Sequence, residues 1–303
     1  MTTIVLGSAA GGGFPQWNCC CPVCRLAWQG DARVRARTQV SLAVSRDGEQ
    51  WTLLNAAPDL RAQLAAVPAL HPIRAAQGAA RGSPIKAVVL TGAEVDQTAG
   101  LLNLRERQPF ALHATAQTMR AVADNPMFAV LADDLVSRHV VAPGARFPLP
   151  GGLEAELFAV PGKVPLYLEE GDAPDTASET EANVGVMVTG GGGRLAFVPG
   201  AAVVTPALKR RLAEADVVLF DGTLFTDDEM IATGTGTKTG RRMGHMPIDG
   251  PEGSLAALAD VAARRIYIHI NNTNPILVEG SPERRRVEAA GWEVAADGLE
   301  IAL

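Results

Sequence analysis

The sequence predicts an α/β fold in which β-sheets are sandwiched between layers of helices. Short apolar runs rich in β-branched residues alternate with alanine- and leucine-rich stretches through both halves of the 303-residue chain. No low-complexity linker separates the halves, so we expect residues 1–303 to form one domain. A hydrophobic content of 47% is sufficient for a large core.

The N-terminal half opens with a buried strand at residues 3–7, which runs into a glycine-rich loop. The elements predicted after it are a β-hairpin (39–44 and 51–55), a helix (58–66), a loop (76–84), a central strand (85–90) and a helix (99–105). Asp47 and Gly48 supply the hairpin turn, and Pro58 is acceptable at a helix start because its missing N–H needs no partner there.

The C-terminal half repeats this pattern. Its predicted elements are a strand (153–160), an acidic surface excursion (169–181), a hairpin (184–189 and 194–198), a helix (207–215), a strand (217–220), a helix (256–264) and a last buried strand (265–270). Glycines at 190–193 provide the hairpin turn, and β-branched residues mark the strands.

Composition and charge exclude several classes of protein. A net charge of −6 gives no electrostatic reason to bind nucleic acid or an anionic membrane. No apolar run reaches the roughly 18–20 residues that a membrane-spanning helix needs, and Met1 leads into a short strand rather than a signal peptide. We therefore expect a cytoplasmic protein without nucleic-acid binding or membrane insertion, with a homodimer as the default oligomer.

All four cysteines lie within six positions, after the polar, glycine-rich segment 11–18. The spacing of Cys19, Cys21 and Cys24 suits one soft tetrahedral ion, and zinc is the usual occupant. The alternatives are buried cysteines acting as small hydrophobic residues, or a disulfide, although Cys19 and Cys21 are too close for an easy bridge. We expect a structural zinc ion in a cysteine-rich loop at residues 11–30.

Polar segments follow four of the hydrophobic strands, at 91–98, 221–223, 244–246 and 269–274. In layered α/β proteins such loops converge on ligand sites. An extended loop would point the carboxylates of Glu94 and Asp96 the same way, and Asp221, His245 and His269 add a carboxylate and two imidazoles. Two histidines with a carboxylate indicate non-haem iron. The alternatives are a solvated turn with a helix N-cap at 94–96 and a core histidine at 269.

A basic, glycine-rich stretch precedes His245. It contains Lys238, Arg241 and Arg242, which are candidate substrate-binding residues because backbone amides and cations together can hold an anion. The spacing does not match a P-loop. An ordinary mobile loop is the alternative.

Several motifs occur in one order along the chain: LGSAAGGG (6–13), PQWNC (15–19), VPGKVPL (160–166), LFDGT (219–223), MGHM (243–246) and HINNTNP (269–275). Through them the sequence resembles, essentially end to end, the pyrroloquinoline quinone (PQQ) biosynthesis protein B family of the metallo-β-lactamase-like superfamily. The resemblance implies a four-layer αβ/βα sandwich with two central mixed β-sheets flanked by helices. It also implies structural Zn²⁺ on Cys19, Cys21 and Cys24.

The resemblance leaves the fourth zinc ligand open. A related hydrolase of this superfamily uses a histidine three residues after the last active-site histidine, which corresponds here to Asn272. Asn272, a neighbouring asparagine or a water is therefore expected to complete the tetrahedron, and Cys20 is a weaker candidate.

The chain departs from the superfamily's two-zinc motif, His-x-His-x-Asp-His. The aligned residues here are Gly92, Glu94, Asp96 and Gln97. The segment 197–200 stands where a bridging aspartate is usual, and relatives in the family commonly keep a histidine where Gln97 lies. A two-zinc hydrolase is therefore not expected. The remaining mononuclear set is Glu94, Asp96, Asp221, His245 and His269.

The resemblance implies a role in PQQ biosynthesis with Fe²⁺ as the active-site cofactor. The expected reaction is hydroxylation of the tyrosine ring in the Glu–Tyr cross-linked product of the PqqA precursor peptide, by a non-haem Fe(II)-dependent oxygenase. The first alternative is a carrier that moves PQQ or its precursor toward the periplasm without catalysis, and the second is a hydrolase. Other PQQ-biosynthesis proteins are the expected partners.

Overall fold

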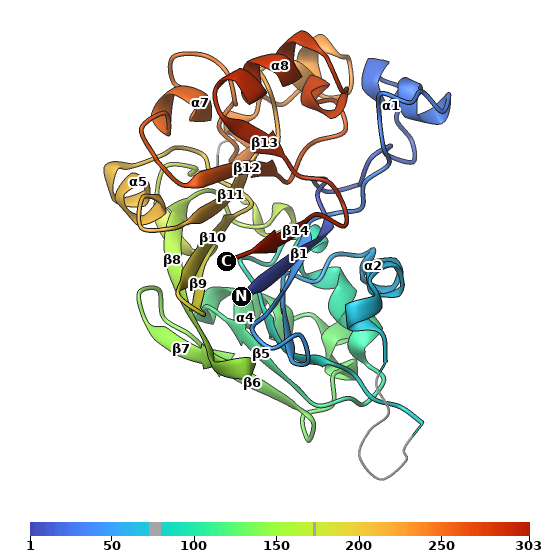
Figure 1. The fold of residues 1–303 in the computed structure, drawn as a ribbon, viewed down its shortest axis with the longest axis vertical. Coiled ribbons are helices and arrows are strands. Elements are labelled where there is room, and N and C mark those ends of the chain that lie inside the picture. Colours follow the sequence, from blue (N-terminus) through green and yellow to red (C-terminus); the bar gives the residue numbers. More distant parts are fainter. Residues whose placement is uncertain (73–79, 172–173) are drawn as a thin grey trace.

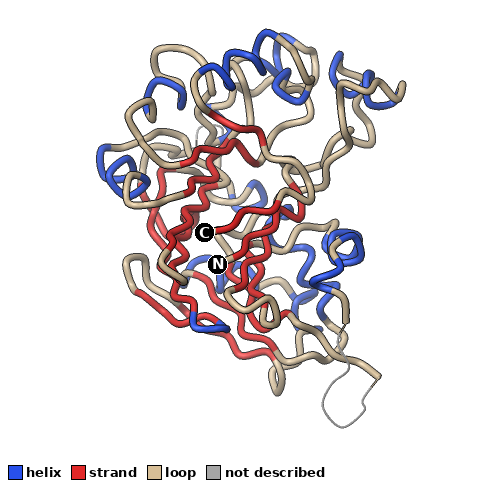
Figure 2. The backbone as a smooth tube through the Cα atoms, in the orientation of Figure 1, coloured by secondary structure: helices blue, strands red, loops and turns tan. Residues whose placement is uncertain are grey.

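The computed structural model describes residues 1–72, 80–171 and 174–303. Within these residues the strands form two mixed sheets of seven strands each (Figures 1 and 2). The first sheet has the order β14 (Glu300–Ala302), β1 (Thr2–Gly7), β2 (Ser41–Ser45), β3 (Trp51–Leu54), β4 (Ile85–Val89), β5 (Phe110–Ala114), β6 (Val136–Val140). The second has the order β13 (Trp292–Val294), β12 (Arg264–Ile268), β11 (Val217–Asp221), β10 (Gly193–Val198), β9 (Glu179–Gly190), β8 (Leu153–Pro161), β7 (Arg146–Leu149).

The two sheets share one pattern of strand directions. From β14 in the first sheet and from β7 in the second, three antiparallel pairs are followed by three parallel pairs. The last strand, β14, pairs with β1, so both chain ends meet in the first sheet, where the Met1 amino group donates to the Leu303 carbonyl at 2.6 Å (Figure 1). The fold is therefore two similar halves, the first completed by the C-terminal strand.

Helices cover the outer faces of both sheets. Those packed on the first sheet are α2 (Leu60–Ala66), η1 (Pro68–Leu70), η3 (Ala99–Leu104), α4 (Ala116–Ala123) and η4 (Pro126–Val130). Those on the second are α5 (Pro206–Leu212), α7 (Ser254–Ala257), η8 (Pro275–Leu277) and α8 (Pro282–Ala289). The helix α1 (Pro22–Trp28) lies in the connection between β1 and β2, and its Val23 and Cys24 join the same apolar cluster. Shorter segments in the connections are α3 (Val95–Thr98), η5 (Pro150–Gly152), η6 (Leu166–Leu168), α6 (Glu229–Ala232) and η7 (Arg241–Met243). The predicted αβ/βα sandwich is confirmed.

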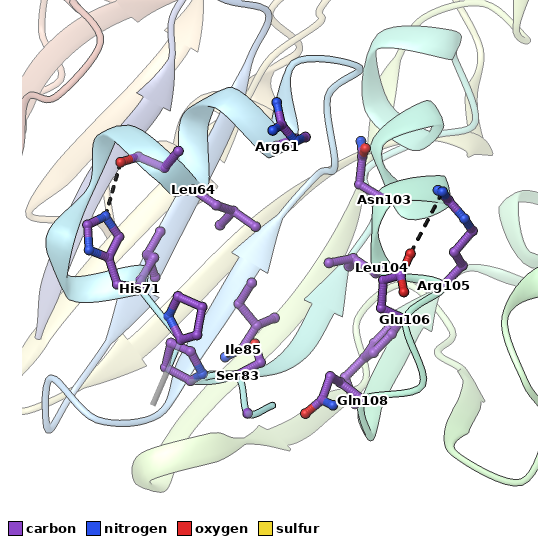
Figure 3. Close-up of a pocket in the computed structure, with 16 residues that line it drawn as sticks. Arg61, Leu64, His71, Ser83, Ile85, Asn103, Leu104, Arg105, Glu106 and Gln108 are labelled. Atoms are coloured by element: carbon purple, nitrogen blue, oxygen red, sulfur yellow. Dashed lines mark hydrogen bonds and ion pairs between the residues drawn. The ribbon is translucent and has the colours of Figure 1, made fainter. Parts of the chain in front are cut away.

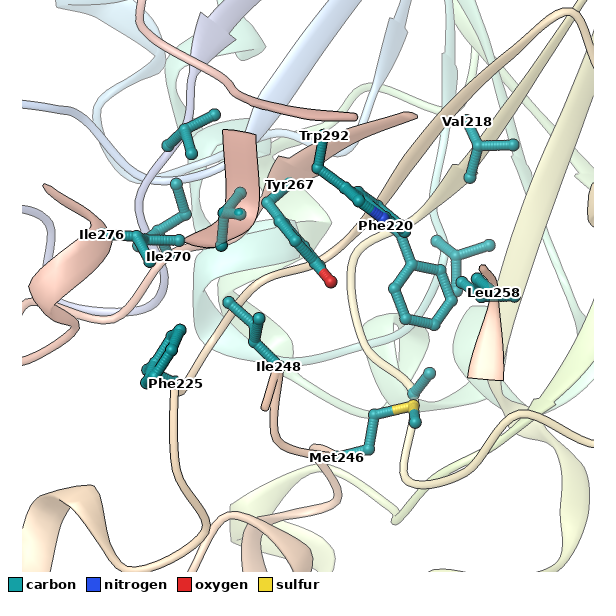
Figure 4. Packing of buried hydrophobic residues seen from close by; sticks show 14 of the residues in the cluster. Val218, Phe220, Phe225, Met246, Ile248, Leu258, Tyr267, Ile270, Ile276 and Trp292 are labelled. Atoms are coloured by element: carbon teal, nitrogen blue, oxygen red, sulfur yellow. The ribbon is translucent and has the colours of Figure 1, made fainter. Parts of the chain in front are cut away.

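The core consists of three apolar layers, one between the sheets and one outside each sheet, because the central strands are buried on both faces. On β11, Leu219 points between the sheets, whereas Val218 and Phe220 point to the helices outside the second sheet. Figure 4 shows this outer layer, where the rings of Tyr267 and Trp292 stack with centroids 4.1 Å apart. Burial on both faces explains why this strand reads as an unbroken apolar run. None of the helices in the described part of the chain has the length and apolar character of a membrane span.

Some predicted elements differ from the structure. The predicted helix at 256–264 is wrong: only the single turn α7 forms, because Arg264 already pairs with Val217 as the start of β12. The helix predicted at 99–105 is the 3₁₀ helix η3, which directly follows α3. The last buried strand ends at Ile268, because His269 adopts a left-handed φ of 57°. The predicted loop at 76–84 lies partly outside the described residues; 80–84 are irregular.

The acidic excursion predicted at 169–181 is only partly a surface segment. Residues 179–181 begin β9, and 172–173 lie outside the described residues. The Glu169 side chain is 7% exposed and paired with Lys163 and Arg242, so its carboxylate belongs to an internal charge network.

The cysteine-rich loop belongs to an excursion, residues 8–38, that is closed at its base by one carboxylate. Asp297 accepts hydrogen bonds from Ser8 N at 3.0 Å and Ser8 Oγ at 2.8 Å, and from Thr38 N at 2.6 Å and Thr38 Oγ1 at 2.8 Å. Because Ser8 follows β1 and Thr38 precedes β2, this clamp fixes where the excursion leaves the first sheet and returns to it.

Stability at acid pH is expected to depend on His113, a buried residue of β5 whose ring stacks on His139 and Phe147. Burial, and then the charge of His139, lowers its pKa to about 4. An unfolded histidine titrates near 6.5, so below that pH the unfolded chain binds the proton first, and stability falls as pH falls toward 4. We expect His113→Phe to remove about 2 kcal/mol of this loss at about pH 4.5, measured by urea unfolding. The exposed His71→Phe is the control; an equal pH dependence in all three proteins contradicts the prediction.

Candidate metal centre and cavity

Three loops and one helix bring the predicted histidines and aspartates together. Asp221 ends β11, His269 follows β12, His245 follows η7 and Asp96 lies in α3. Ligand atoms of Asp221, His245 and His269 lie within 4.8 Å of one another. The two imidazole rings stack with centroids 5.1 Å apart. Loops far apart in sequence thus converge because their strands are neighbours.

The buried Asp221 carboxylate orients the two histidines. Its Oδ2 accepts from Ala201 N at 2.9 Å and from His245 Nδ1 at 2.7 Å. Its Oδ1 accepts from Thr223 Oγ1 at 2.6 Å, and that hydroxyl lies 2.8 Å from His269 Nδ1. Since a carboxylate can only accept, His245 carries its hydrogen on Nδ1. The lone pair of its Nε2 is then available to accept a proton or to bind a metal ion.

Asp96 forms the second half of the centre, through a 3.0 Å contact between its Oδ2 and His269 Nε2. Burial alone would raise the pKa of Asp96, but the hydrogen bond from His269 outweighs it and the pKa is lowered. Burial would lower the pKa of His269, but the bond to Asp96 and the nearby carboxylates raise it. Burial would also raise the pKa of Asp221, yet the His245 charge and hydrogen bond lower it. The centre therefore favours positive charge between buried carboxylates.

The geometry also fits a divalent cation in place of the proton between Asp96 Oδ2 and His269 Nε2. For metal–ligand bonds of about 2.1 Å, neighbouring ligand atoms lie about 3 Å apart, which the spacing of Asp96 Oδ2 and His269 Nε2 matches. Metal-binding histidines commonly donate their other ring N–H to an oxygen acceptor, as His269 Nδ1 can to Thr223.

The positions that hold the further metal ligands of a two-metal centre carry no imidazole or carboxylate in this chain. At Gly92 a Cβ would lie 2.5 Å from Gln97 Oε1, and that oxygen accepts from Glu94 N at 3.2 Å. Gly200, in the segment where a bridging aspartate is usual, has no side chain that could supply a carboxylate, and a Cβ there would lie 3.4 Å from His245 Cε1. The site supports one cation rather than a bridged pair.

Glu94 does not join this centre. Its Oε1 accepts from Lys163 Nζ at 2.9 Å and from Leu166 N at 3.1 Å. The prediction that Glu94 and Asp96 point the same way assumed an extended loop. In the structure Glu94 is the extended N-cap of α3 and Asp96 lies within the helix, so their side chains diverge.

The three candidate substrate-binding cations also separate. Lys238 lines the cavity. Arg241 donates to the exposed Glu252 at 2.8 Å and lies outside the cavity lining, which corrects its predicted place beside Lys238. Arg242 donates to Glu169 at 3.1 Å. The short helix η7 turns these two neighbours to different sides.

The centre opens into a cavity of about 330 Å³. Its polar lining residues are Gln16, Glu94, Asp96, Gln97, Lys163, Glu169, Asn183, Thr223, Lys238, His245, His269 and Asn271. Gln16, Lys163, Glu169, Asn183 and Thr223 had no role predicted from sequence. Lys163 and Thr223 stand inside the motifs at 160–166 and 219–223, which was the available signal.

A larger cavity of about 510 Å³ lies outside the first sheet between α2 and η3 (Figure 3). Its polar residues are dispersed: His71 Nε2 contacts the Ala65 carbonyl, and Arg105 pairs with Glu106 at 3.7 Å. The smaller cavity, which contains the histidine and aspartate centre, is therefore the candidate active site.

The cysteine cluster forms a second possible metal site at the tip of the excursion. Sulfur atoms of Cys19, Cys21 and Cys24 lie within 4.8 Å of one another, and in the described chain all four cysteines are free. Cys21 is the N-cap of α1, with its sulfur accepting from Cys24 N at 3.4 Å. Cys20 is exposed. With Zn–S bonds of about 2.3 Å, sulfurs about 3.8 Å apart would surround a tetrahedral ion, so a small contraction suffices.

Asn272 closes the open side of the cluster. Its Nδ2 lies 3.1 Å from Cys19 Sγ and 3.3 Å from Cys24 Sγ. Rotating the amide by half a turn places Oδ1 there instead, as a fourth oxygen ligand. The Cys21 pKa is raised because its thiol hydrogen bonds to Cys24 and is buried, and the bond from Cys21 lowers the pKa of Cys24. The Cys21 thiol therefore keeps its proton and donates it to the Cys24 sulfur, which favours the thiolate form that binds metal ions.

This fold and this centre define a protein of the metallo-β-lactamase type with a histidine and aspartate metal site. Residues 50–270 match the family described as Beta-lactamase superfamily domain. Over their full lengths, the chain is 58% identical to coenzyme PQQ synthesis protein B of Methylobacterium nodulans. It is 55% identical to that of Rhizobium meliloti, with 99% of this chain and 97% of the relative covered. The chain belongs to the coenzyme PQQ synthesis protein B family.

Solved structures agree with this placement. The crystal structure of Zn(2+)-bound PqqB from Methylobacterium extorquens has a TM-score of 0.96 and 55% identity, with both chains fully covered. A new diphosphatase from the PhnP family has a TM-score of 0.68 at 21% identity, covering 100% of this chain and 97% of that one. At that identity the second likeness concerns the fold alone.

Proposed function

We propose that the chain acts in PQQ synthesis as an Fe(II)-dependent oxygenase that hydroxylates the tyrosine ring of the PqqA-derived Glu–Tyr cross-linked intermediate. The observation that carries this proposal is the 3.0 Å pair of Asp96 Oδ2 and His269 Nε2 in a cavity without the ligands of a second ion. Membership of the PQQ synthesis protein B family supports the substrate. We also propose that residues 1–303 form one domain.

Asp96 and His269 would hold the Fe(II), which supplies activation of dioxygen and open positions beside the substrate. His245 then has the general-base role. Its Nδ1 is fixed by Asp221 at 2.7 Å, so Nε2 is the atom that takes a proton from the phenol. The buried Asp221 stabilises the resulting imidazolium.

We further propose that Cys19, Cys21 and Cys24 bind structural zinc, with the Asn272 amide oxygen as the fourth ligand. The Zn²⁺-bound relative supports a zinc site in the family. Because Asn272 stands three residues after His269, this ion would also brace the loop that presents the histidine.

The function is tested by mass spectrometry of the cross-linked diamino acid after incubation with iron-loaded protein, dioxygen and a two-electron reductant such as ascorbate. The reductant balances the reaction, because one oxygen atom enters the ring and the other leaves as water. Addition of an oxygen atom to the tyrosine ring, incorporated from labelled dioxygen, is expected. Iron-loaded, folded protein that leaves the substrate unchanged contradicts the proposal.

A carrier that binds PQQ or its precursor is the second candidate. It is favoured by Gln97, whose neutral amide is a weaker metal ligand than an imidazole. Calorimetric titration with PQQ, with and without metal, separates the two: tight binding that needs no metal favours the carrier.

Lys238 is expected to bind a substrate carboxylate, because it lines the cavity and no ion pair to it is found among the described residues. Lys238→Met should raise KM about tenfold with little change in kcat, as loss of one charge-assisted contact implies. Arg241→Met is the matched control, since Arg241 already pairs with Glu252. If both substitutions raise KM equally in steady-state kinetics, the position of Lys238 in the cavity does not determine substrate binding.

A further inference from the structure

One wall of the cavity is formed by residues 162–170, a segment after β8 that we call the strap. Gly162, Lys163, Leu166 and Glu169 of the strap line the cavity. Its turn η6 is apolar and exposed: the exposed fractions of Leu166, Tyr167 and Leu168 are 60%, 52% and 45%. Because these three apolar side chains are largely exposed, η6 depends on polar contacts to hold its position.

Those contacts converge on the residues just before α3. The Glu94 carboxylate accepts from Lys163 Nζ at 2.9 Å and from Leu166 N at 3.1 Å. The Tyr167 hydroxyl donates to the Ala93 carbonyl at 2.8 Å. One carboxylate therefore joins the strap to the helix that carries Asp96.

Lys163 is the cationic partner in this network. Its Nζ also forms an ion pair with Glu169 Oε1 at 2.8 Å and donates to the Val164 carbonyl at 3.3 Å. Burial would lower the pKa of Lys163, but the bond to Glu169 and the charge of Glu94 raise it. Glu169 is held in turn by Arg242 at 3.1 Å. Lys163 thus links two carboxylates of the protein, and its charge is already paired with both.

The stem of Lys163 also packs against the loop that presents His245. A Cβ at Gly244, which has a φ of 85°, would lie 3.2 Å from Lys163 Cγ and 3.4 Å from Lys163 N. Only a bare glycine backbone leaves this space without displacing the lysine. The same side chain therefore touches the α3 wall, the strap and the His245 loop.

We propose that Glu94 and Lys163 are positioning residues, an ion pair that fastens the strap to α3 and to the His245 loop and so shapes the cavity beside the metal centre. On this view Glu94 is not a metal ligand. The effect on substrate binding rests on the proposed function, whereas the effect on the strap does not.

The first test is hydrogen exchange of the strap in Glu94→Gln and Lys163→Met, with bound iron measured in parallel. We expect protection of amides at 162–170 to fall about tenfold or more, since a local tie is lost, while bound iron stays at the wild-type level. Asp96→Asn should show the reverse, with iron lost and the strap protected. Glu252→Gln removes an exposed ion pair outside the cavity lining and should leave both measurements unchanged.

Exchange of core amides separates loss of the ion pair from general destabilisation. Amides of β4 and β11 should keep wild-type protection in Glu94→Gln and Lys163→Met, because only a local contact is lost. The proposal is overturned if Glu94→Gln loses iron as Asp96→Asn does, if strap exchange is unchanged, or if the core amides lose protection as much as the strap does. These readouts need no turnover, so they decide the question even if the hydroxylation itself is not observed.

Discussion

Replacing His269 is expected to remove the cation from the cavity and to abolish activity, while leaving zinc on the cysteines. His269 is the residue in which the two halves of the centre meet, through Asp96 at Nε2 and Thr223 at Nδ1. Loss of groups that only orient metal ligands already costs roughly 10–100-fold in affinity, so loss of a ligand should cost more. Bound iron and product formation are the measurements.

The choice of replacement decides how clearly this result can be interpreted. His269 has a φ of 57°, a left-handed conformation that asparagine tolerates better than alanine. His269→Asn therefore removes the imidazole with little added backbone strain, and His71→Ala removes an exposed histidine as the control. Full iron binding and activity in His269→Asn would show that the reaction occurs elsewhere.

The convergence of Asp221, His245 and His269 could be predicted because each follows an apolar strand or a glycine-rich loop, and strand ends meet at one edge of a sheet. The place of Glu94 could not. Its direction depends on whether α3 begins before or after Val95, a difference of one residue that side-chain patterns do not determine.

The pairing of strands far apart in the chain could not be predicted from the sequence either. The strand β14 completes the first sheet by pairing with β1, from opposite ends of the chain, and nothing in its three residues specifies that partner. The same limit applies to Arg241 and Arg242: two adjacent cations read as one basic patch, but Glu252 and Glu169 draw them to different sides. Local patterns predicted the layers, and tertiary partners decided which charges face the cavity.

Cys21→Ser is expected to abolish zinc binding and to destabilise the excursion at residues 8–38. Cys21 supplies a sulfur and also caps α1, and serine keeps an N-cap acceptor for that helix, so the substitution removes the ligand without removing the cap. If free zinc exceeds its dissociation constant a thousandfold, the bound ion contributes about 4 kcal/mol to stability. Denaturant unfolding with and without a chelator should show this difference in the wild type and not in the variant.

Cys20→Ser is the matched control, because Cys20 is adjacent in sequence but exposed and outside the cluster of three sulfurs. It should keep zinc and stability. The physical link to the cavity is the segment 269–274, in which His269 faces Asp96 and Asn272 faces the sulfurs. If zinc braces that segment, Cys21→Ser should also weaken iron binding, although the iron ligands are intact. A variant that loses zinc yet binds iron as tightly as the wild type would show that the two sites are independent.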